Sequence, residues 1–466
     1  MSINTPFPSI YDGWTREQLI SRLHDLEHPT SSTPNPTTST TQHQKTKPSK
    51  RPPKQYDFTK TSCRPIALKL AYLGHEYHGF AGSENDTVTT IETHLFHALT
   101  TVKLIPDRSA CGYSRCGRTD KGVSAFDQVV GLFVRSVYPA GIIDNVVKGG
   151  TYRWEDVAKV SYRASKDEEA EENVATDSSI APPSNPPIEN IHELDYPLLL
   201  NKLLPPTIRI LAWSPVLPTF SARYNCLARA YRYYFTPSPN LDIAAMKTAC
   251  QDFLGVHDYT NFCKVDPSRH VSHIRYIDHV GIYSVDEIDA LASAKNSSSN
   301  SDTKPLIFYV KGRAFLWHQV RCMMAILFLI GSHLEPTSII STLLSTPSES
   351  EGRPTYDLAP EHPLVLAECE FPKDMFAWRF SRVSRDVNVG IVKEVWREVV
   401  IKGAMVEYLV QCAESCGGGV EEEEVEGGRD VAVASNSRRR EYTPVLLLAR
   451  AASQQSRLAK LDTKAA

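Results

Sequence analysis

The sequence has little of several features that define whole classes of protein. It holds ten cysteines but no pair of CxxC motifs, which disfavours a structural zinc site and predicts reduced thiols in an intracellular protein. Its longest apolar run, residues 322–330, is far shorter than the ~20 residues that cross a bilayer, so we expect no membrane association. The first ten residues show no basic region followed by an apolar one, so we expect no secretory signal.

A strong excess of either charge is also missing. The formal net charge of -3 predicts no general attraction to polyanions, so a nucleic-acid surface would have to be a local basic patch, offset by acidic segments elsewhere. Hydrophobic residues make up 41% and charged residues 23%, which is enough apolar material for a real core. A length of 466 residues predicts two or three domains.

Four segments have too little apolar surface to offset the entropy of ordering, and we expect them to be disordered. They are residues 29–57, 165–188, 293–304 and 413–440. The chain then divides into an N-terminal arm with its linker (1–57), a first half (58–190), a second half (191–382) and a C-terminal helix with an acidic and basic tail (383–466).

Periodicity predicts an α+β fold of two similar halves, each a helix-backed, mostly antiparallel sheet. In the first half, residues 66–73 alternate as a strand does. Thr89 and Glu92 then predict a capping box before a helix, and 129–134 form a second strand. The second half repeats the mixture. Strands are predicted at 207–216, 227–235, 272–284, 305–312 and 363–371, and helices at 240–255 and 315–331. A further amphipathic helix is predicted after residue 385.

The stretch SRCGRTDKGVSAF, residues 114–126, concentrates charge beside glycine. It is compatible with a β-turn that is closed by Gly122 and supported by hydrogen bonds from the Asp120 side chain. It is equally compatible with a reactive carboxylate on a loop, because the nearby Arg118 and Lys121 would favour the ionised form of Asp120 as a nucleophile or base.

Arg321 lies in the predicted helix 315–331, which is apolar almost all round. A buried guanidinium without a partner is costly, so Arg321 needs an anion, for which Asp120 and Asp258 are candidates. The alternative is that the side chain extends from the first turn to solvent. His318, at the head of the same helix, suits either a polar contact to a ligand or an ordinary hydrogen-bonded position.

Tyr231 shares one face of its predicted strand with Tyr233 and Phe235. Such aromatic stripes usually belong to the core. A tyrosine between Arg229 and Arg232 also suits stacking on an unstacked base beside a phosphate. Both interpretations stay open from the residues alone.

Five blocks in the right order resemble the TruA-type tRNA pseudouridine synthases. RCGRTDKGVSAFDQVV resembles the signature loop of that family. The other matching blocks are ALKLAYLGHEYHGFAGSE, FSARYNCLARAYRYYF, FLGVHDYTNFCK with FLWHQVRCMMAILFLIG, and PLVLAECEF. Together they cover most of 64–372. RCGRTDKGVSAF and NFCK are most similar to the eukaryotic branch that modifies positions 38 and 39 of the anticodon stem-loop. The loop GFAGSEND departs from the Trp-Gln-Arg of bacterial members, and the insertion at 137–190 has no counterpart in short members.

The resemblance implies a role for four residues. Asp120 matches the essential aspartate, and Arg321 matches the arginine that pairs with it. Tyr231 matches the tyrosine that packs against the target base, and Arg118 matches the arginine that helps hold the extruded nucleotide. It also implies that the two halves join around a central active-site cleft, that the enzyme is a homodimer acting on tRNA, and that no cofactor or metal takes part.

Two other functions fit parts of the pattern. A non-catalytic RNA-binding protein of the same fold would need the basic and aromatic groups but not Asp120. An aspartyl-phosphate enzyme would want an apolar strand leading into the aspartate, and YSRCGRT is polar. The basic runs KTKPSKRPPK and SRRR suit solvated tails or a nuclear address, so we expect the protein in the nucleus and cytoplasm.

Overall fold

The computed structural model describes most of the two predicted halves. The described residues are 56–82, 88–142, 150–158, 192–264, 272–292, 305–345, 353–415, 442–448 and 450. The N-terminal arm up to residue 55, the predicted disordered insertions 165–188 and 293–304, and residues 416–440 of the segment predicted disordered over 413–440 lie outside these ranges. Residues 413–415 of that segment are helical instead, so the prediction is wrong for them. Within them, no helix is both long and apolar enough to cross a membrane.

The centre of the fold is one ten-stranded sheet, in which pairing is antiparallel except between β3 and β10. The strand order is β4-β1-β3-β10-β6-β9-β8-β7, while β2 pairs with β3 and β5 pairs with β1. The strands are β1 (Ser62–Tyr72), β2 (Ser114–Arg115), β3 (Ser124–Ser136), β4 (Tyr152–Arg153), β5 (Ile208–Pro215), β6 (Ala228–Phe235), β7 (Gly255–Asp258), β8 (Ile274–Ser284), β9 (Leu306–Gly312) and β10 (Leu364–Glu370).

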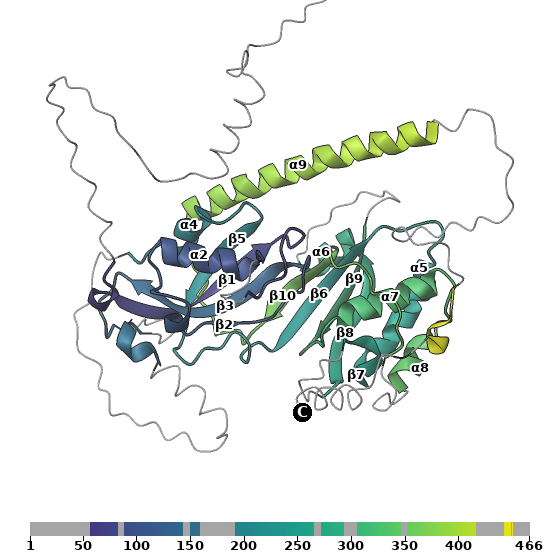
Figure 1. Ribbon diagram of the computed structural model, residues 1–466, viewed down its shortest axis with the longest axis horizontal. Coiled ribbons are helices and arrows are strands. Elements are labelled where there is room, and N and C mark those ends of the chain that lie inside the picture. The colour runs from purple at the N-terminus through teal and green to yellow at the C-terminus, as the bar shows by residue number, and fades with distance from the viewer. Residues whose placement is uncertain are drawn as a thin grey trace, which may run out of the picture. The chain divides into compact units, whose positions relative to one another are not determined.

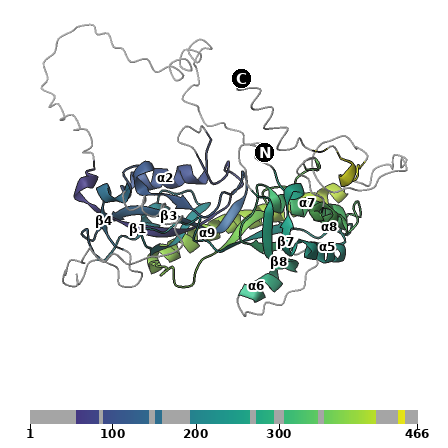
Figure 2. The ribbon, with the colours of Figure 1, turned by 90° about the horizontal axis from the view of Figure 1, so that it is seen from below.

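Seven α-helices are found in the described residues. They are α2 (Ile91–Thr101), α4 (Tyr196–Asn201), α5 (Ile243–Ala249), α6 (Val285–Ala292), α7 (Gln319–Gly331), α8 (Ile339–Ser345) and α9 (Arg382–Ser415). Figures 1 and 2 show α2 beside β1 and β3, and α5, α7 and α8 gathered near β7 and β8. The predicted mixture of helices with mostly antiparallel strands is therefore confirmed, but the described strands pair into one ten-stranded sheet and not into a separate sheet for each half.

Apolar side chains form two main clusters, one on each part of the sheet. The first joins α2 and α4 to β1, β3 and β5 through residues such as Leu68, Leu95 and Ile210. The second joins α5, α7 and α8 to β6, β8 and β9 through residues such as Met246 and Ile326. The short parallel contact between β3 and β10 links the strands of the two clusters.

Two helix starts differ from the sequence prediction. The N-cap of α2 is Thr90, whose side chain accepts a hydrogen bond from the backbone N–H of Thr93, so the predicted capping box of Thr89 and Glu92 is wrong. The helix predicted from residue 315 begins at Gln319 instead. His318 takes a left-handed backbone conformation (φ 64°), which cannot continue into a helix, so residues 315–318 form a loop.

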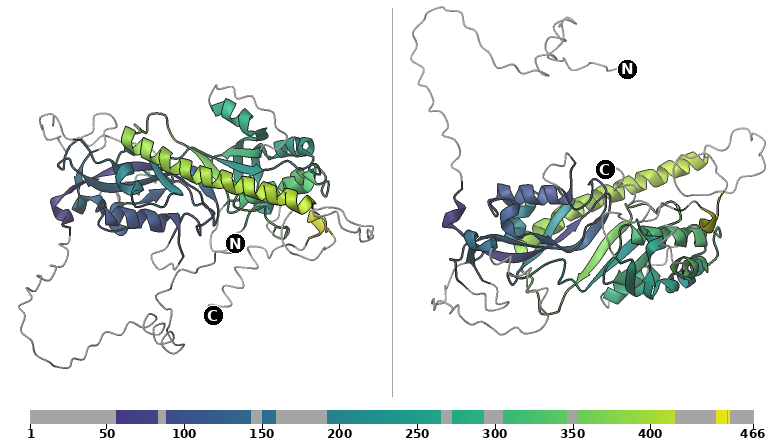
Figure 3. Two further views of the ribbon diagram at one scale, coloured as in Figure 1. Left: turned by 90° about the horizontal axis from the view of Figure 1, so that it is seen from above. Right: turned by 60° about the horizontal axis from the view of Figure 1, so that its bottom comes forward.

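The predicted C-terminal helix is confirmed as α9, which has 34 residues. It starts beside α4 and β5 (Figure 1), and its long course is seen again in Figure 3. Near this start, the Asn388 side-chain amide donates to the carbonyl oxygen of Ile210 at 2.9 Å. Much of its apolar side-chain surface is exposed, for example at Trp396, Val399 and Leu409.

Candidate active-site cleft

The loop that carries Asp120 is held on two sides by a neighbouring segment, residues 72–80. The Tyr72 hydroxyl lies 2.7 Å from the hydroxyl of Thr119. The backbone N–H of Phe80 donates to the carbonyl oxygen of Thr119 at 3.1 Å, and that of Gly122 donates to the carbonyl oxygen of Tyr77 at 3.1 Å. These bonds on both sides of Asp120 fix the position from which its side chain leaves the loop.

Asp120 itself begins the predicted β-turn. The Val123 N–H donates to the Asp120 carbonyl oxygen at 3.2 Å, and Gly122 has φ 79°, as glycine does at the third position of a type II turn. A Cβ added to Gly122 would lie 2.6 Å from Cγ of Glu361, so a side chain here would also collide. The Asp120 carboxylate does not cap its own turn as expected, because it points to residues after β9 instead.

Two side chains from the loop before α7 face the Asp120 carboxylate. The Trp317 indole N–H donates to Oδ1 at 3.1 Å, and Nε2 of His318 lies 3.7 Å from Oδ2. Lys264 stands over the Trp317 ring, with its Nζ 4.2 Å from the ring centroid. The carboxylate remains about one third exposed (32%), so it is held in place and still open to a ligand.

Burial raises the pKa of Asp120, against the electrostatic effect of Arg321, the hydrogen bond from Trp317 and the charge of Lys264. The sequence predicted the opposite net direction, with Arg118 and Lys121 as the stabilising cations. The reason is that desolvation of the carboxylate outweighs the neighbouring charges. Burial also lowers the pKa of His318 to about 4, so this ring is neutral near pH 7 and supplies no counter-charge.

Arg321 is half-buried in the first turn of α7 and has an anionic partner, as predicted, but that partner differs from those expected. Its Nη2 donates to Glu361 Oε2 at 2.9 Å, and its Nε donates to the carbonyl oxygen of Ala359 at 2.7 Å. The side chain is only 13% exposed, which excludes the extended position in solvent. Its ion-pair partner is therefore neither Asp120 nor Asp258, and it affects Asp120 through its charge alone.

Tyr231 and Arg118 line the same cavity as Asp120. Tyr231 is half-buried, and its ring meets that of Phe315 edge to face, with centroids 4.9 Å apart. It packs against both apolar clusters, so the core interpretation and the ligand-facing interpretation of this tyrosine are compatible. Arg118 is exposed on the loop of Asp120. The structure thus brings all four predicted site residues to one cavity.

The cavity has a volume of about 1430 Å³ and a strongly one-sided charge. Among the described residues that line it, Asp120 is the single carboxylate, surrounded by nine arginine and lysine side chains. These cations are Arg108, Arg115, Arg118, Lys121, Arg223, Arg229, Lys264, Arg275 and Arg321. Arg108 and Arg115 pair with Glu92, and Arg321 pairs with Glu361, so six of the nine cations remain beside Asp120, and this excess of positive charge suits a polyanion. It is the local basic patch that a nucleic-acid surface in this chain would require.

Sequence reasoning missed Trp317, Lys264 and Tyr224 as cleft residues. Trp317 and Tyr224 are 45% and 63% exposed, unusual for large aromatic side chains, and both line the cavity. Trp317 was missed because it was placed inside the helix. The sequence did hold a signal for Tyr224, because an aromatic residue next to Arg223 is typical of a nucleic-acid surface. In the structure, the Arg223 guanidinium lies 5.4 Å from the centroid of the Tyr224 ring.

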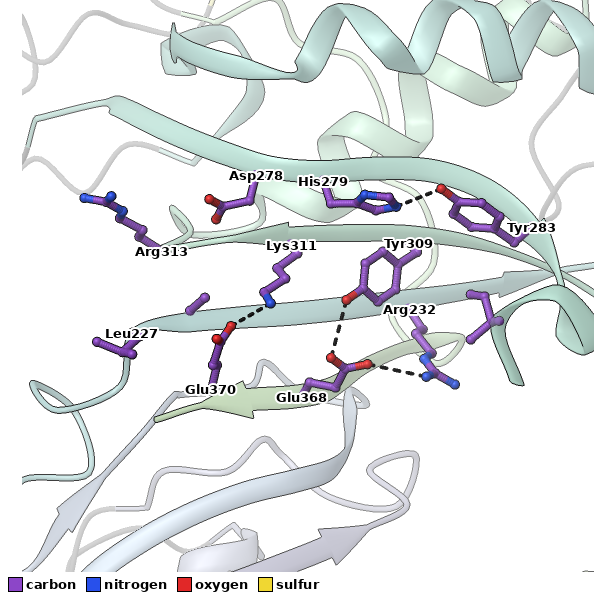
Figure 4. Close-up of a pocket in the computed structure, with 12 residues that line it drawn as sticks. Leu227, Arg232, Asp278, His279, Tyr283, Tyr309, Lys311, Arg313, Glu368 and Glu370 are labelled. Atoms are coloured by element: carbon purple, nitrogen blue, oxygen red, sulfur yellow. Dashed lines mark hydrogen bonds and ion pairs between the residues drawn. The ribbon is translucent and has the colours of Figure 1, made fainter. Parts of the chain in front are cut away.

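A second cavity, of about 740 Å³, lies on the part of the sheet formed by β6, β8, β9 and β10. Its charges are matched within it, as Figure 4 shows: Lys311 pairs with Glu370 at 2.6 Å, and Arg232 pairs with Glu368 at 3.5 Å. The predicted alternation of β6 is visible here, because Arg232 lines this cavity while Tyr231 lines the other. With its charges compensated, this cavity is the weaker candidate for a polyanion.

Comparison with known proteins defines the class. A family model described as tRNA pseudouridine synthase matches residues 249–372. The chain is 37% identical to the tRNA pseudouridine(38/39) synthase of mouse, over 81% of this chain and 70% of the relative. It is 38% identical to the human protein of that name (76% and 65%) and 35% identical to that of Saccharomyces cerevisiae (78% and 72%). The chain belongs to the tRNA pseudouridine synthase family.

Proposed function

We propose that this chain isomerises uridine to pseudouridine in tRNA, at positions 38 and 39 of the anticodon stem-loop. The observation that carries the proposal is a single, partly exposed carboxylate among nine cations in a cavity large enough for an extruded nucleotide. The names of the mouse, human and yeast relatives support the choice of uridines.

The reaction needs no redox step and no added group. The N1–C1′ bond of uridine breaks, a C5–C1′ bond forms, the proton leaves C5, and N1 gains one. A base inside a stem must first be flipped out, at a cost of a few kcal/mol of unstacking. The cations of the cavity would hold the displaced backbone, Arg118 among them, while Tyr231 covers the base.

Asp120 is the residue that acts on the flipped nucleotide. Three first steps are compatible with its placement: attack on C1′, attack on C6, or removal of the 2′ proton. Each needs the ionised carboxylate. Arg321, Trp317 and Lys264 all favour that form, in this order of effect. Arg321 would act on Asp120 through its positive charge, without a direct contact, while it pairs with Glu361.

Replacing Asp120 by asparagine tests the assignment. We expect Asp120→Asn to abolish pseudouridine formation on an unmodified tRNA while the tRNA still binds, because the substitution keeps the size of the side chain and removes only its charge. Asp127→Asn is a matched control, since Asp127 pairs with Lys69 and lies outside the cavity. Near wild-type activity in Asp120→Asn would refute the assignment. Mapping of pseudouridine in cells without the protein would test positions 38 and 39.

We also propose the finer architecture implied by the resemblance: two similar halves, residues 58–190 and 191–382, around the central cleft. The two apolar clusters and their parallel junction at β3 and β10 support it. Proteolysis that first cuts near 165–188 and 293–304, and leaves the halves associated, would agree with these boundaries.

A homodimer is proposed from the exposed surface of α9. Val389, Val392, Trp396 and Val399 follow the three-and-four spacing of a coiled-coil seam, and Val406 lies seven residues further along, with Gly403 at the position between. All five apolar side chains are more than two fifths exposed. The seam suits a second helix. We expect the wild-type chain to sediment as a dimer and Val399→Glu to sediment as a monomer, with exposed Lys393→Glu as the control. A monomeric wild type would contradict the proposal.

Localisation to the nucleus and cytoplasm is proposed from the basic runs at 45–54 and 437–440, which lie outside the described residues. Imaging of a fluorescent fusion with the first run neutralised would test it, since an unchanged nuclear fraction would remove its basis.

A further inference from the structure

Three cysteines from distant parts of the chain converge beside the cleft. The Sγ atoms of Cys116, Cys226 and Cys369 all lie within 4.8 Å of one another, and those of Cys116 and Cys369 are 3.2 Å apart. Among the described residues, these three form the only group of three or more histidine, cysteine or acidic side chains that could share an ion. The sequence prediction of no metal site rested on local CxxC spacing, which cannot detect ligands contributed by separate strands.

Each cysteine comes from a segment that shapes the cleft. Cys116 follows β2 and stands four residues before Asp120 in the same loop. Cys226 lies just before β6, the strand of Tyr231, and Cys369 lies in β10, which pairs with β6. A ligand shared by the three sulfurs would therefore tie the Asp120 loop to the strand that carries Tyr231.

The geometry is close to that of a thiolate metal site. Zn–S bonds of about 2.3 Å in a tetrahedral arrangement place sulfur atoms about 3.8 Å apart, which lies between the 3.2 Å contact and the 4.8 Å limit found here. Small side-chain rotations would equalise the three distances. The three cysteines are 3%, 8% and 9% exposed, so their sulfur atoms are largely shielded from solvent.

The structure also provides for the net charge of such a site and for the fourth ligand of a tetrahedral ion. Three thiolates around a divalent ion carry one net negative charge, and the Arg229 guanidinium donates to the carbonyl oxygen of Cys116 at 2.8 Å. Arg229 therefore supplies a compensating positive charge beside the group. Cys116 lines the large cavity, so water can reach the ion from that side as a fourth ligand.

We propose that Cys116, Cys226 and Cys369 bind one thiophilic metal ion, Zn²⁺, which fixes the Asp120 loop against β6 and β10. The ion takes no part in the isomerisation. Ligands that are soft thiolates select such an ion over Mg²⁺ or Ca²⁺. The inference concerns metal binding and does not depend on the activity proposed above.

Metal analysis of the full-length chain tests the proposal. The protein is purified without a metal-affinity step, kept reduced and dialysed, and its zinc is measured by mass spectrometry. We expect about one equivalent per chain in the wild type. Cys116→Ser, Cys226→Ser and Cys369→Ser should each hold less than about a fifth of that amount. Cys250→Ser is the matched control, because Cys250 is also fully buried but donates to the Lys247 carbonyl oxygen, away from the group.

A second measurement avoids variants that fail to fold. Cadmium is added to the metal-free wild-type chain, and the ultraviolet band of thiolate-to-metal charge transfer is followed. A band that saturates at about one equivalent supports the site. The proposal is overturned if the wild type holds no zinc and gives no band, or if Cys250→Ser loses as much metal as the other three. A Cys116–Cys369 disulfide in a zinc-free wild-type chain that was kept reduced would overturn it as well.

Discussion

At the scale of single residues, the pKa of Asp120 depends on two opposing effects. Burial raises the pKa of its carboxyl group, while Arg321, Trp317 and Lys264 lower it. Because the proposed chemistry needs the ionised form, activity should fall as the pH drops through this raised pKa. The acidic limb of the pH profile should therefore lie above the ~3.9 of an ordinary aspartate.

Trp317→Phe should move that limb to higher pH. The substitution removes the hydrogen bond to Asp120 Oδ1, which lowers the pKa of the carboxyl group, and keeps an aromatic ring, so the pKa of Asp120 should rise further. The measurement is kcat/KM for pseudouridine formation across pH. Trp378→Phe, a half-buried tryptophan outside the cavity, should leave the limb in place.

Glu361→Gln should move the same limb the other way. The negative charge of Glu361 raises the pKa of Asp120, and Glu361 also pairs with Arg321. A neutral glutamine removes both the negative charge and the compensation of Arg321, whose positive charge then acts on Asp120 in full. We expect the pKa of Asp120 to fall. If both variants shift the limb in one direction, the assignment of the limb to Asp120 is wrong.

At the scale of elements, Glu92 joins α2 to the cleft wall. Its carboxylate is fully buried in the first turn of α2, and it accepts hydrogen bonds from Arg108 (2.9 Å), Tyr113 (2.9 Å) and Arg115. All three donors line the cavity. The residue predicted to cap its own helix therefore orients side chains of the cleft.

Glu92→Gln should lower the free energy of unfolding by about 2 kcal/mol, because two guanidinium groups lose the charge of their buried partner. Urea unfolding measures this change. Glu76→Gln, at an exposed glutamate, should change the free energy by less than about 0.5 kcal/mol. Equal free energies of unfolding in the two variants would show that the Glu92 carboxylate contributes little to stability.

At the scale of the whole molecule, charge is unevenly distributed. The net charge is -3, yet nine cations and one carboxylate line a single cavity. Binding of an RNA backbone there releases counterions, so the logarithm of the binding constant should fall linearly with the logarithm of salt concentration.

Arg223→Ala should reduce the slope of that salt dependence by about 0.7 to 0.9, the amount expected for one phosphate contact. Arg223 is exposed at the cavity, so its loss should not disturb the core. Filter binding of unmodified tRNA at several salt concentrations measures the slope. Arg153→Ala, at an exposed arginine outside the cavity, should leave it unchanged, and equal slopes in all three proteins would contradict the prediction.

The sequence by itself determined the longer strands and helices and their order, because alternation in strands such as β1 and the periodicity of α5 are local properties, while it missed the short elements β2, β4, β7, α4, α6 and α8. It also determined the β-turn at Gly122, which depends on the conformational freedom of one residue. The family resemblance added Asp120, Arg118, Tyr231 and Arg321 as residues of one site.

Only the tertiary structure decided which side chains meet. Arg321 pairs with Glu361, Trp317 donates to Asp120, and Cys116 lies beside Cys226 and Cys369, although these partners are far apart in the chain. Burial likewise reversed the predicted direction of the Asp120 pKa. The physical reason is that contacts and desolvation depend on how strands and loops pack in space, whereas periodicity and turn chemistry are already present in each short segment.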